Sequence, residues 1–338
     1  MDLNTIWFLL VGVLFIGYAI LDGFDLGVGV LSLFGKSPEE KRIHLNAIGP
    51  VWDGNEVWLL TGGGALFAAF PPVYATVFSG FYMALMLLLF ALIARAVSME
   101  FRSKVDSPGW QKFWDAAFGI GSLLPAVLFG VAFGNILRGV PITEDHMWAG
   151  SFFGLLNPYS ILIGVVTLVL MVTHGAAYMV LKTDGELRDR MKAWSMRGFY
   201  AFVALYILAT IATALVSPWL FEGVLTNPIF WLLVVLMVGA VAAFPTMTKK
   251  DRPFAAFLAT STMMLSGIGF AALSLFPRLV PSSLDLDWSL TAYNASSTDR
   301  TLTVMLIIAL VGMPFVIGYT AVIYRVFKGK VILDDTSY

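Results

Sequence analysis

The feature that most restricts the fold of this chain is a series of long apolar runs, separated by short polar segments, that recurs from one end to the other. A run of about 20 apolar residues can cross the hydrocarbon core of a bilayer as an α-helix. Continuous runs also favour helices over the alternating strands of a membrane barrel. Nine runs fit this description: Ile6–Phe34, Val51–Phe70, Tyr74–Met99, Phe113–Leu137, Pro158–Leu181, Phe199–Leu220, Ile229–Met247, Phe254–Phe276 and Leu302–Phe327.

The composition agrees with a chain that lies mostly in lipid. Charged residues make up only 13% of the 338 residues, against roughly 25% in soluble domains. A net charge of −1 gives no sign of nucleic-acid binding, and the absence of cysteine excludes disulfides and cysteine-held metal sites. We therefore predict an all-α polytopic membrane protein in which residues 1–338 form a single integral membrane domain. The first apolar run is expected to be a retained span and not a cleaved leader.

The basic residues divide unevenly between the two sides of such a bundle. Alternate segments on one side hold 18 Lys and Arg residues, whereas the other side holds only Arg138, Arg278 and Arg300. Since cytoplasmic segments carry the excess of Lys and Arg, we predict that the N-terminus lies outside and the C-terminus in the cytoplasm. This orientation requires an odd number of spans, in agreement with nine. The longest outer loop is then formed by residues 277–301.

Two aspartates interrupt the first apolar run. Asp22 and Asp25 are three positions apart, so they share one face of a helix. Gly23 and Gly27 add a pattern of small residues that allows a second helix to approach closely. Ionisable groups inside a span are costly and usually functional. One interpretation is a buried pair that accepts protons. The other is that this long helix extends beyond the bilayer and leaves both carboxylates among cytoplasmic headgroups.

A second acidic pair, Asp53 and Glu56, opens the second run, close to Trp58. Helix chemistry offers a simple explanation, because carboxylates at the N-terminal end of a helix are stabilised by its dipole. The glycines Gly62–Gly64 follow in the apolar part and require a closely packed neighbour, for which the glycine-rich first helix is the best candidate. If these helices pack, four carboxylates gather in one cytoplasmic seam, where burial and mutual repulsion suit them to proton transfer.

The remaining polar candidates are single side chains. Arg95, near the cytoplasmic end of the third run, either extends to the headgroups or neutralises the acidic cluster. His174 stands alone in the fifth run, which is more typical of a hydrogen-bonded contact between helices than of a ligand. His44 and His146 are predicted to lie on surface loops. The sequence contains no phosphate-binding loop, nucleophile elbow or helical metal-binding pair.

Nine blocks of sequence are more specific than hydropathy: Asp22–Gly27, Trp52–Trp58, Thr61–Pro71, Phe78–Tyr82, Phe101–Lys104, Gly130–Asn135, Leu156–Tyr159, Phe276–Pro277 and Pro281–Leu284. Together they resemble subunit II of the cytochrome bd-type quinol oxidases, and they cover nearly the whole chain. The segment from Trp52 to Asn55, followed by the glycine triplet, is the most specific of them. The short length and the segment 182–186 resemble the compact, cyanide-insensitive branch of that family.

The resemblance implies a nine-helix subunit of a respiratory complex in the bacterial cytoplasmic membrane, paired with a homologous subunit I. Such complexes oxidise quinol, reduce O2 to water at haem d, and generate a proton motive force without pumping. The resemblance also implies that subunit I holds two b haems and one d haem, and that side chains of this chain bind no cofactor or metal. The three histidines of the chain agree with that. Membrane lipids are expected to surround the subunit. The resemblance does not decide whether the complex also contains a small accessory membrane subunit and a structural quinone.

Individual residues can be matched to the family pattern. The resemblance implies that Asp25 and Asp53 are acidic members of a cytoplasmic proton path, with Asp22 and Glu56 as further members. Trp58 and Arg95 are expected to line the route for gas or protons. Glu56 departs from the pattern, since some members carry an amide at that position. Glutamine replaces His174 in some members, which argues against an obligatory ligand there.

Two other functions stay open from the sequence. A proton-coupled secondary transporter would place its carboxylates on broken helices near the middle of the membrane, although the chain shows no internal repeat. A purely structural membrane subunit would differ from the oxidase subunit only in the roles of Asp25 and Asp53.

Overall fold

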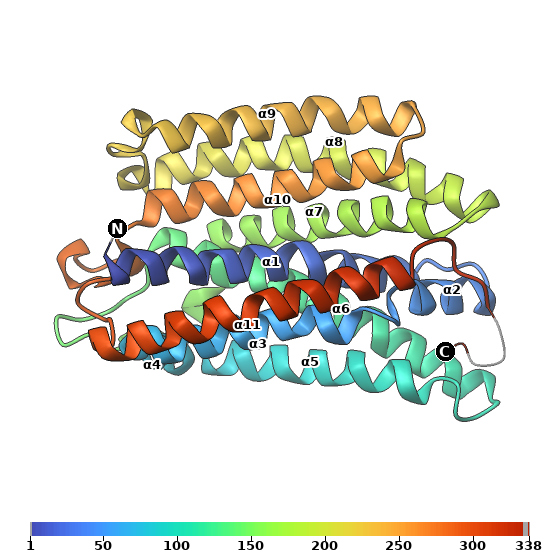
Figure 1. Cartoon of the computed structure of the whole chain (residues 1–338), viewed down its shortest axis with the longest axis horizontal. Coiled ribbons are helices and arrows are strands. Elements are labelled where there is room, and N and C mark those ends of the chain that lie inside the picture. The colour runs from blue at the N-terminus through green and yellow to red at the C-terminus, as the bar shows by residue number, and fades with distance from the viewer. Residues whose placement is uncertain (1, 334–336, 338) are drawn as a thin grey trace.

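The computed structural model describes residues 2–333 and 337, and it is built almost entirely from helices that run along one axis (Figure 1). The α-helices are α1 (Leu3–Ser32), α2 (Pro38–Ile48), α3 (Trp52–Ala69), α4 (Pro71–Gly80), α5 (Tyr82–Phe101), α6 (Pro108–Arg138), α7 (Pro158–Lys182), α8 (Gly185–Val216), α9 (Pro228–Lys249), α10 (Pro253–Leu275) and α11 (Asp299–Val326). Short 3₁₀ helices and strands lie in the connections: η1 (Phe153–Leu155), η2 (Pro218–Phe221), η3 (Val224–Thr226), η4 (Leu286–Trp288), β1 (Arg278–Val280) and β2 (Leu290–Thr291).

Eight helices in the described part of the chain are long and apolar enough to cross a membrane: α1, α5, α6, α7, α8, α9, α10 and α11. This confirms the prediction of an all-α membrane protein. The predicted second span corresponds to α3, which is less apolar because Asp53, Asn55 and Glu56 lie in its first turns. α3 nevertheless packs along α1.

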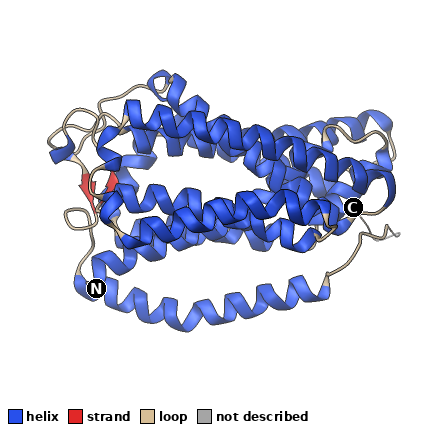
Figure 2. Cartoon of the chain, turned by 90° about the horizontal axis from the view of Figure 1, so that it is seen from above, coloured by secondary structure: helices blue, strands red, loops and turns tan. Residues whose placement is uncertain are grey.

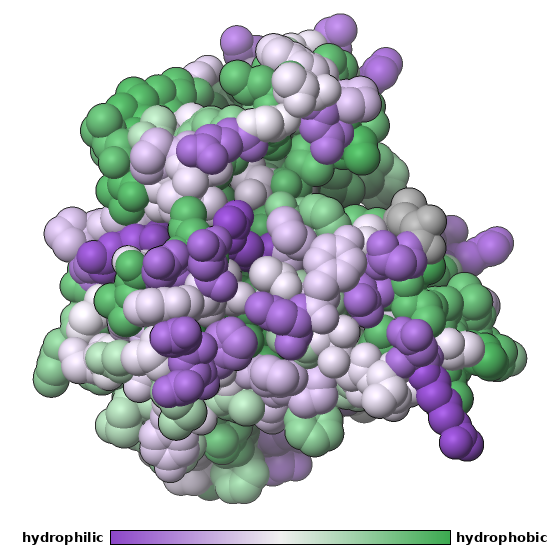
Figure 3. All heavy atoms as spheres, turned by 90° about the vertical axis from the view of Figure 1, so that its left-hand side faces the viewer, coloured by the Kyte–Doolittle hydropathy of each residue, from purple (hydrophilic) through white to green (hydrophobic). Residues whose placement is uncertain are grey.

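The two termini lie at opposite ends of the bundle. The N-terminus and the β1–β2 pair lie at one end, and the C-terminus lies at the other (Figure 2). At the N-terminal end, the connections 139–157 and 276–298 pack together, since Val140 pairs with Ser282 and the Ser282 hydroxyl donates to the Ile142 carbonyl at 2.7 Å. Seen from this end, hydrophilic residues gather across the middle and hydrophobic residues appear at the rim (Figure 3).

The prediction of one long third span, Tyr74–Met99, is wrong. The helix α4 begins at Pro71, and the chain turns at Phe81 before α5. The Phe81 ring is buried and lies 5.6 Å from the ring of Trp148, measured between centroids. A Cβ on Gly80 would lie only 2.2 Å from the same tryptophan. The chain therefore breaks where the connection between α6 and α7 packs against it.

The segment between α1 and α3, predicted to be a loop, contains the helix α2. His44 of this helix is fully buried and does not lie on the surface as predicted. Its Nδ1 lies 2.7 Å from the Glu40 carbonyl oxygen, and the Glu40 carboxylate pairs with Arg190 of α8. Burial lowers the pKa of His44 to about 4. α2 thus buries a neutral histidine and is held against α8 by an ion pair.

The central helix of the bundle is α1. Its residues 22–32 are buried on every side, and it packs against α3, α6, α7 and α10. The closest approach is to α7: a Cβ on Gly27 would lie 2.0 Å from the Met171 carbonyl oxygen, and one on Gly175 would lie 2.6 Å from the Gly27 backbone. Backbones can meet in this way only where side chains are absent.

The glycine triplet of α3 packs only in part as predicted. A Cβ on Gly62 would lie 3.4 Å from Phe15, so this residue faces α1. A Cβ added to Gly63 or Gly64 would meet no atom of the described chain within 4 Å. These two glycines therefore lie on an open face of α3. Successive residues of a helix point in different directions, so α1, which lies on one side of α3, covers only one of the three glycines.

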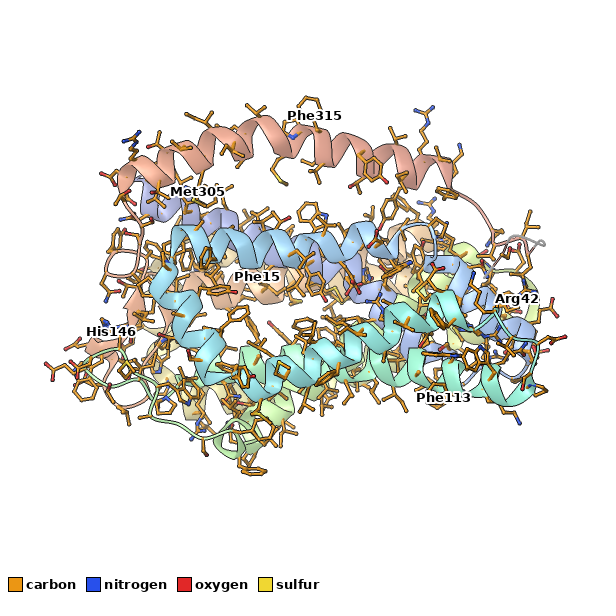
Figure 4. The ribbon with its side chains drawn as sticks, turned by 90° about the horizontal axis from the view of Figure 1, so that it is seen from below. Phe15, Arg42, Phe113, His146, Met305 and Phe315 are labelled. Atoms are coloured by element: carbon orange, nitrogen blue, oxygen red, sulfur yellow. The ribbon has the colours of Figure 1, made fainter. Side chains whose placement is uncertain are left out.

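The last helix, α11, lies at the edge of the bundle. Only 6% of its apolar span is buried, and Phe315 points away from the other helices (Figure 4). Its two ends are attached: Leu302 accepts a hydrogen bond from the Trp7 indole at 2.9 Å through its carbonyl, and Lys182 donates to the Phe327 carbonyl at 2.6 Å. The middle of α11 is thus the least covered part of the described spans.

The contact between α1 and α7 predicts that Gly27→Ala destabilises the protein by about 1–3 kcal/mol, because the added methyl group overpacks the interface. The matched control on the same helix is Gly12→Ala, where an added Cβ meets no atom within 4 Å. Thermal denaturation of the purified membrane protein measures both. Equal midpoints for the two variants would contradict the close contact.

The burial of His44 predicts a loss of stability in mild acid. Its pKa lies below the ordinary 6.5 in the folded state, so the unfolded chain binds more protons and the free energy of unfolding falls as the pH drops from 6.5 towards 4. At about 1.36 kcal/mol for each pKa unit, the loss reaches roughly 3 kcal/mol. Thermal denaturation at several pH values measures it. The His44→Gln variant should lose this part of the pH dependence, and a slope equal to that of the unmodified protein would contradict the assignment.

Candidate functional site

Four charged side chains from three helices meet inside the bundle. This ionic cluster consists of Asp22 and Asp25 of α1, Glu56 of α3 and Arg95 of α5. Asp22, Asp25 and Arg95 have no exposed surface, and the Glu56 side chain is 23% exposed. The two aspartates are thus enclosed by protein and do not lie among headgroups. Charged groups at such positions are rare in membrane spans and need partners.

Arg95 supplies the positive charge of the ionic cluster. Its Nη2 lies 2.9 Å from Oδ1 of Asp22, and its Nη1 lies 2.7 Å from Oε1 of Glu56 and 3.4 Å from Oδ2 of Asp22. The planar guanidinium can hold two carboxylates at once, which an ammonium group on a lysine cannot do with the same geometry. Of the two interpretations for Arg95, the geometry therefore matches a neutralising ion pair and not a side chain that extends to the headgroups.

Asp25 lies beside this ion pair and takes its hydrogen bond from another residue. The Asn55 amide of α3 donates from Nδ2 to Oδ2 of Asp25 at 2.7 Å. The other oxygen of Asp25, Oδ1, is buried and has no hydrogen-bond partner in the described chain. Three carboxyl groups thus lie near one guanidinium in the interior, and only two of them pair with it. Such an arrangement is favourable only if the excess negative charge is reduced, and binding of a proton does this.

Asp53 does not join the ionic cluster, in contrast to the prediction that four carboxylates gather. It lies in the first turn of α3 with an exposed side chain, and it makes no hydrogen bond or ion pair within residues 2–333 and 337. The reason is helical rotation: positions 53 and 56 are three apart but only the second faces α5. Asp53 therefore marks the open face of α3, about one helical turn from Glu56.

Close contacts with neighbouring backbones set the positions of Trp58 and Arg95, the two residues predicted to line the route for gas or protons. A Cβ on Gly17 of α1 would lie 2.3 Å from the ring of Trp58, so the indole lies directly on the α1 backbone. A Cβ on Gly121 of α6 would lie 2.9 Å from the Arg95 amide nitrogen. α6 is therefore pressed against the backbone that carries the guanidinium. Trp58 and Arg95 are both fixed by glycines on neighbouring helices.

Two members of the site were missed from the sequence. Asn55 links Asp25 to Tyr324 of α11, whose hydroxyl lies 3.0 Å from the Asn55 Oδ1. Asn55 lies between the acidic residues of α3, and this position is the signal that could have identified it. Nothing in the pattern of α11 singles out Tyr324, because its role depends on how α11 is rotated against α3.

The two buried histidines, His44 and His174, do not fit haem ligation. His174 uses both ring nitrogens, with Nδ1 at 2.6 Å from the Thr260 hydroxyl and Nε2 at 3.0 Å from the Ile20 carbonyl. His44 bonds through Nδ1, and its Nε2 is enclosed by protein. The described residues contain no group of three His, Asp or Glu side chains that could hold a metal ion. His174 thus connects α7 with α1 and α10, as a hydrogen-bonded contact between helices.

The helices and the ionic cluster define a class of protein: a polytopic helical membrane protein with charges enclosed between its spans. Sequence comparisons give the family. Residues 3–327 match the model of the cytochrome bd terminal oxidase subunit II family. The chain is 41% identical to a cytochrome bd ubiquinol oxidase subunit 2 from Bacillus subtilis, over 98% of this chain and 97% of the relative. It is 39% identical to a cytochrome bd-I ubiquinol oxidase subunit 2 from Escherichia coli, over 98% and 96%.

A further relative is a probable cytochrome oxidase subunit 2 from Haemophilus influenzae, 40% identical over 97% of this chain and 95% of the relative. Among solved structures, a chain of the bd oxidase from Geobacillus thermodenitrificans matches with a TM-score of 0.79 and covers 97% of this chain and 99% of that chain. Its sequence identity is 16%, so it shows a shared fold.

The chain belongs to the cytochrome bd terminal oxidase subunit II family. It is therefore a subunit of a cytochrome bd-type oxidase and a multi-pass protein of the bacterial cytoplasmic membrane. The resemblance found in the sequence is confirmed, and the secondary transporter is left without support. The assignment to the compact, cyanide-insensitive branch stays a prediction.

The ionic cluster predicts that Arg95→Gln prevents stable assembly. Removing one partner of a buried ion pair leaves the other charge uncompensated and lowers the stability of the folded protein by about 3–5 kcal/mol. The control is Arg197→Gln on α8, whose side chain is exposed. The yield of folded protein from detergent-solubilised membranes, measured by size-exclusion chromatography, compares the two. A second change, Asp22→Asn, should partly restore the yield of Arg95→Gln, since it removes the carboxylate that lost its partner.

Proposed function

We propose that this chain is the haem-free subunit II of a quinol:oxygen oxidoreductase, and that it stabilises a haem-bearing subunit I and delivers protons to the oxygen-reducing site. Family membership supports the oxidase, and the names of the B. subtilis and E. coli relatives support ubiquinol as the class of reductant. The engaged or enclosed nitrogens of His44 and His174 support haem binding by the partner. The chain is not catalytic alone.

The proposed topology has nine crossings with the N-terminus outside. In this topology α3 supplies the ninth crossing, because it packs along α1 and runs between α2 at one end of the bundle and α4 at the other (Figure 1). The termini at opposite ends agree with an odd number of crossings (Figure 1). Of the 18 basic residues counted on the side of the C-terminus, the 17 other than the enclosed Arg95 support a cytoplasmic position for that side, with residues 277–301 as the longest outer loop.

We further propose that subunit I covers the open face formed by α3 and α11. This face holds large exposed apolar side chains, among them Leu60 at 73% and Phe315 at 75% exposure. It also holds Asp53, and a carboxylate that faced lipid at this position would be strongly unfavourable. A protein partner can supply the hydrogen bonds that lipid chains lack. Gly63 and Gly64, where an added Cβ would meet no atom of the described chain within 4 Å, would let a helix of the partner approach closely.

The single observation that carries the proton-transfer role is the excess of carboxyl groups over guanidinium in the ionic cluster. Asp22 and Glu56 share Arg95, so Asp25 is the member best placed to gain and lose a proton. Asp53 on the open face would exchange protons with the cytoplasm or the partner. Glu56, which is partly exposed, lies between the interior and Asp53. Trp58 would close this route on the side of α1.

The role of Asp53 is tested with Asp53→Asn in the complete oxidase. We expect full haem content with quinol oxidase activity lowered by about tenfold or more, because a proton-transferring group contributes at least this much to rate. Oxygen consumption and the membrane potential of reconstituted vesicles are the measurements. The control is Glu39→Gln, an exposed acid of α2. Full activity and full membrane potential in Asp53→Asn would favour a purely structural subunit.

A further inference from the structure

The amide of Asn55 is held in one orientation by three groups from two other helices. Its Nδ2 donates to Oδ2 of Asp25 at 2.7 Å and to the Leu21 carbonyl at 3.3 Å, and its Oδ1 accepts from the Tyr324 hydroxyl at 3.0 Å. The Leu21 carbonyl can only accept, so the NH2 group must face it and, beside it, Asp25. The oxygen must then face the hydroxyl, which donates. Asn55 is 2% exposed, so water has little access to replace these bonds.

Asp25 depends on Asn55 for its hydrogen bonding. Arg95 pairs with Asp22 and Glu56 and not with Asp25. Within residues 2–333 and 337, Oδ1 of Asp25 has no partner and Oδ2 accepts from Asn55. Hydrogen bonds to a carboxylate favour its charged form. The orientation of the Asn55 amide therefore decides how well Asp25 is stabilised after it loses a proton.

Tyr324 is placed at Asn55 by contacts on both sides. Its ring meets the Phe24 ring edge-on, with centroids 6.5 Å apart. The chain that follows is bound to the end of α7: Lys182 donates to the Phe327 carbonyl at 2.6 Å, and Val331 donates its amide to the Lys182 carbonyl at 2.9 Å. Lys330 donates to the Thr183 carbonyl at 2.6 Å. The cytoplasmic end of α11 is thus fixed where the hydroxyl meets the amide.

We propose that Tyr324 is a positioning residue for the proton transfer of Asp25: by donating to Oδ1 of Asn55, its hydroxyl keeps the amide NH2 directed at the Asp25 carboxylate. The proposal rests on the proposed function of Asp25. The charged or titratable groups that face Asp25 are Asp22, Glu56, Arg95, Tyr178 and Tyr324, from α1, α3, α5, α7 and α11. Tyr324 is the one that acts on Asp25 through the Asn55 amide, and it comes from the most loosely packed span.

The test is Tyr324→Phe in the complete oxidase, which removes the hydroxyl and keeps the ring that meets Phe24. We expect normal haem content, quinol oxidase activity lowered about 3- to 10-fold at neutral pH, and a rate–pH profile displaced to higher pH. In infrared difference spectra, the carbonyl band that is lost in Asp25→Asn should change frequency in Tyr324→Phe. The control is Tyr200→Phe, an exposed tyrosine of α8.

A double variant tests whether Tyr324 acts on Asp25 through Asn55, because the effects of the two substitutions should then not add. In an Asn55→Ser background, Tyr324→Phe should have no further effect on rate or pH profile, because the link is already broken. Asn55→Ser alone should also displace the profile, and this measurement decides the question if Tyr324→Phe does not assemble. If Asp25→Asn keeps full activity, the proposed function fails. If Asp25→Asn is impaired but Tyr324→Phe and Asn55→Ser keep the rate, profile and infrared band of the unmodified oxidase, only the positioning role is overturned.

Discussion

The interaction on which the rest of the structure depends is the ion pair of one buried guanidinium with two carboxylates. Arg95 is fully enclosed and holds Asp22 of α1 and Glu56 of α3 at once. A positive charge without these partners would not be stable between membrane helices. The same is true of the acids without Arg95. The three helices α1, α3 and α5 therefore have to meet at this point, and the remaining acid, Asp25, is left in a place where its charge is not balanced.

Close packing makes this electrostatic arrangement possible. Gly27 and Gly175 bring α1 and α7 into backbone contact, and Gly121 brings α6 against the backbone of Arg95. α1 is consequently buried on all sides over residues 22–32. Its buried carboxyl groups therefore take hydrogen bonds from side chains of neighbouring helices: Asp22 from Arg95, and Asp25, at Oδ2, from Asn55. The glycines thus fix which partners the acids can reach.

The sequence predicted the helical membrane class from its apolar runs, and it offered Asp22, Asp25, Glu56 and Arg95 as candidates for one cluster together with Asp53, which does not join them. Apolar runs define spans, and spacings of three place Asp22 with Asp25 on one face. It did not predict how each helix is rotated against its neighbours. That rotation puts Glu56 inside and Asp53 outside, lets Gly62 pack while Gly63 and Gly64 stay open, and brings Tyr324 to Asn55. The helix α2 and the burial of His44 were missed because a short polar helix has no apolar run to mark it.

The acids form a graded series of exposure from the interior to the open face, and this adds to the support that the excess of carboxyl groups gives to the proposed proton transfer. Asp25 is fully enclosed, Glu56 is partly exposed, and Asp53 is exposed. A purely structural ion pair would need Asp22, Glu56 and Arg95, which already satisfy one another's geometry. It would not explain a second enclosed carboxyl beside the pair, nor an acid on a face otherwise lined with apolar residues and bare glycines. Both features are useful if a proton moves between the enclosed acid and a surface covered by a partner subunit.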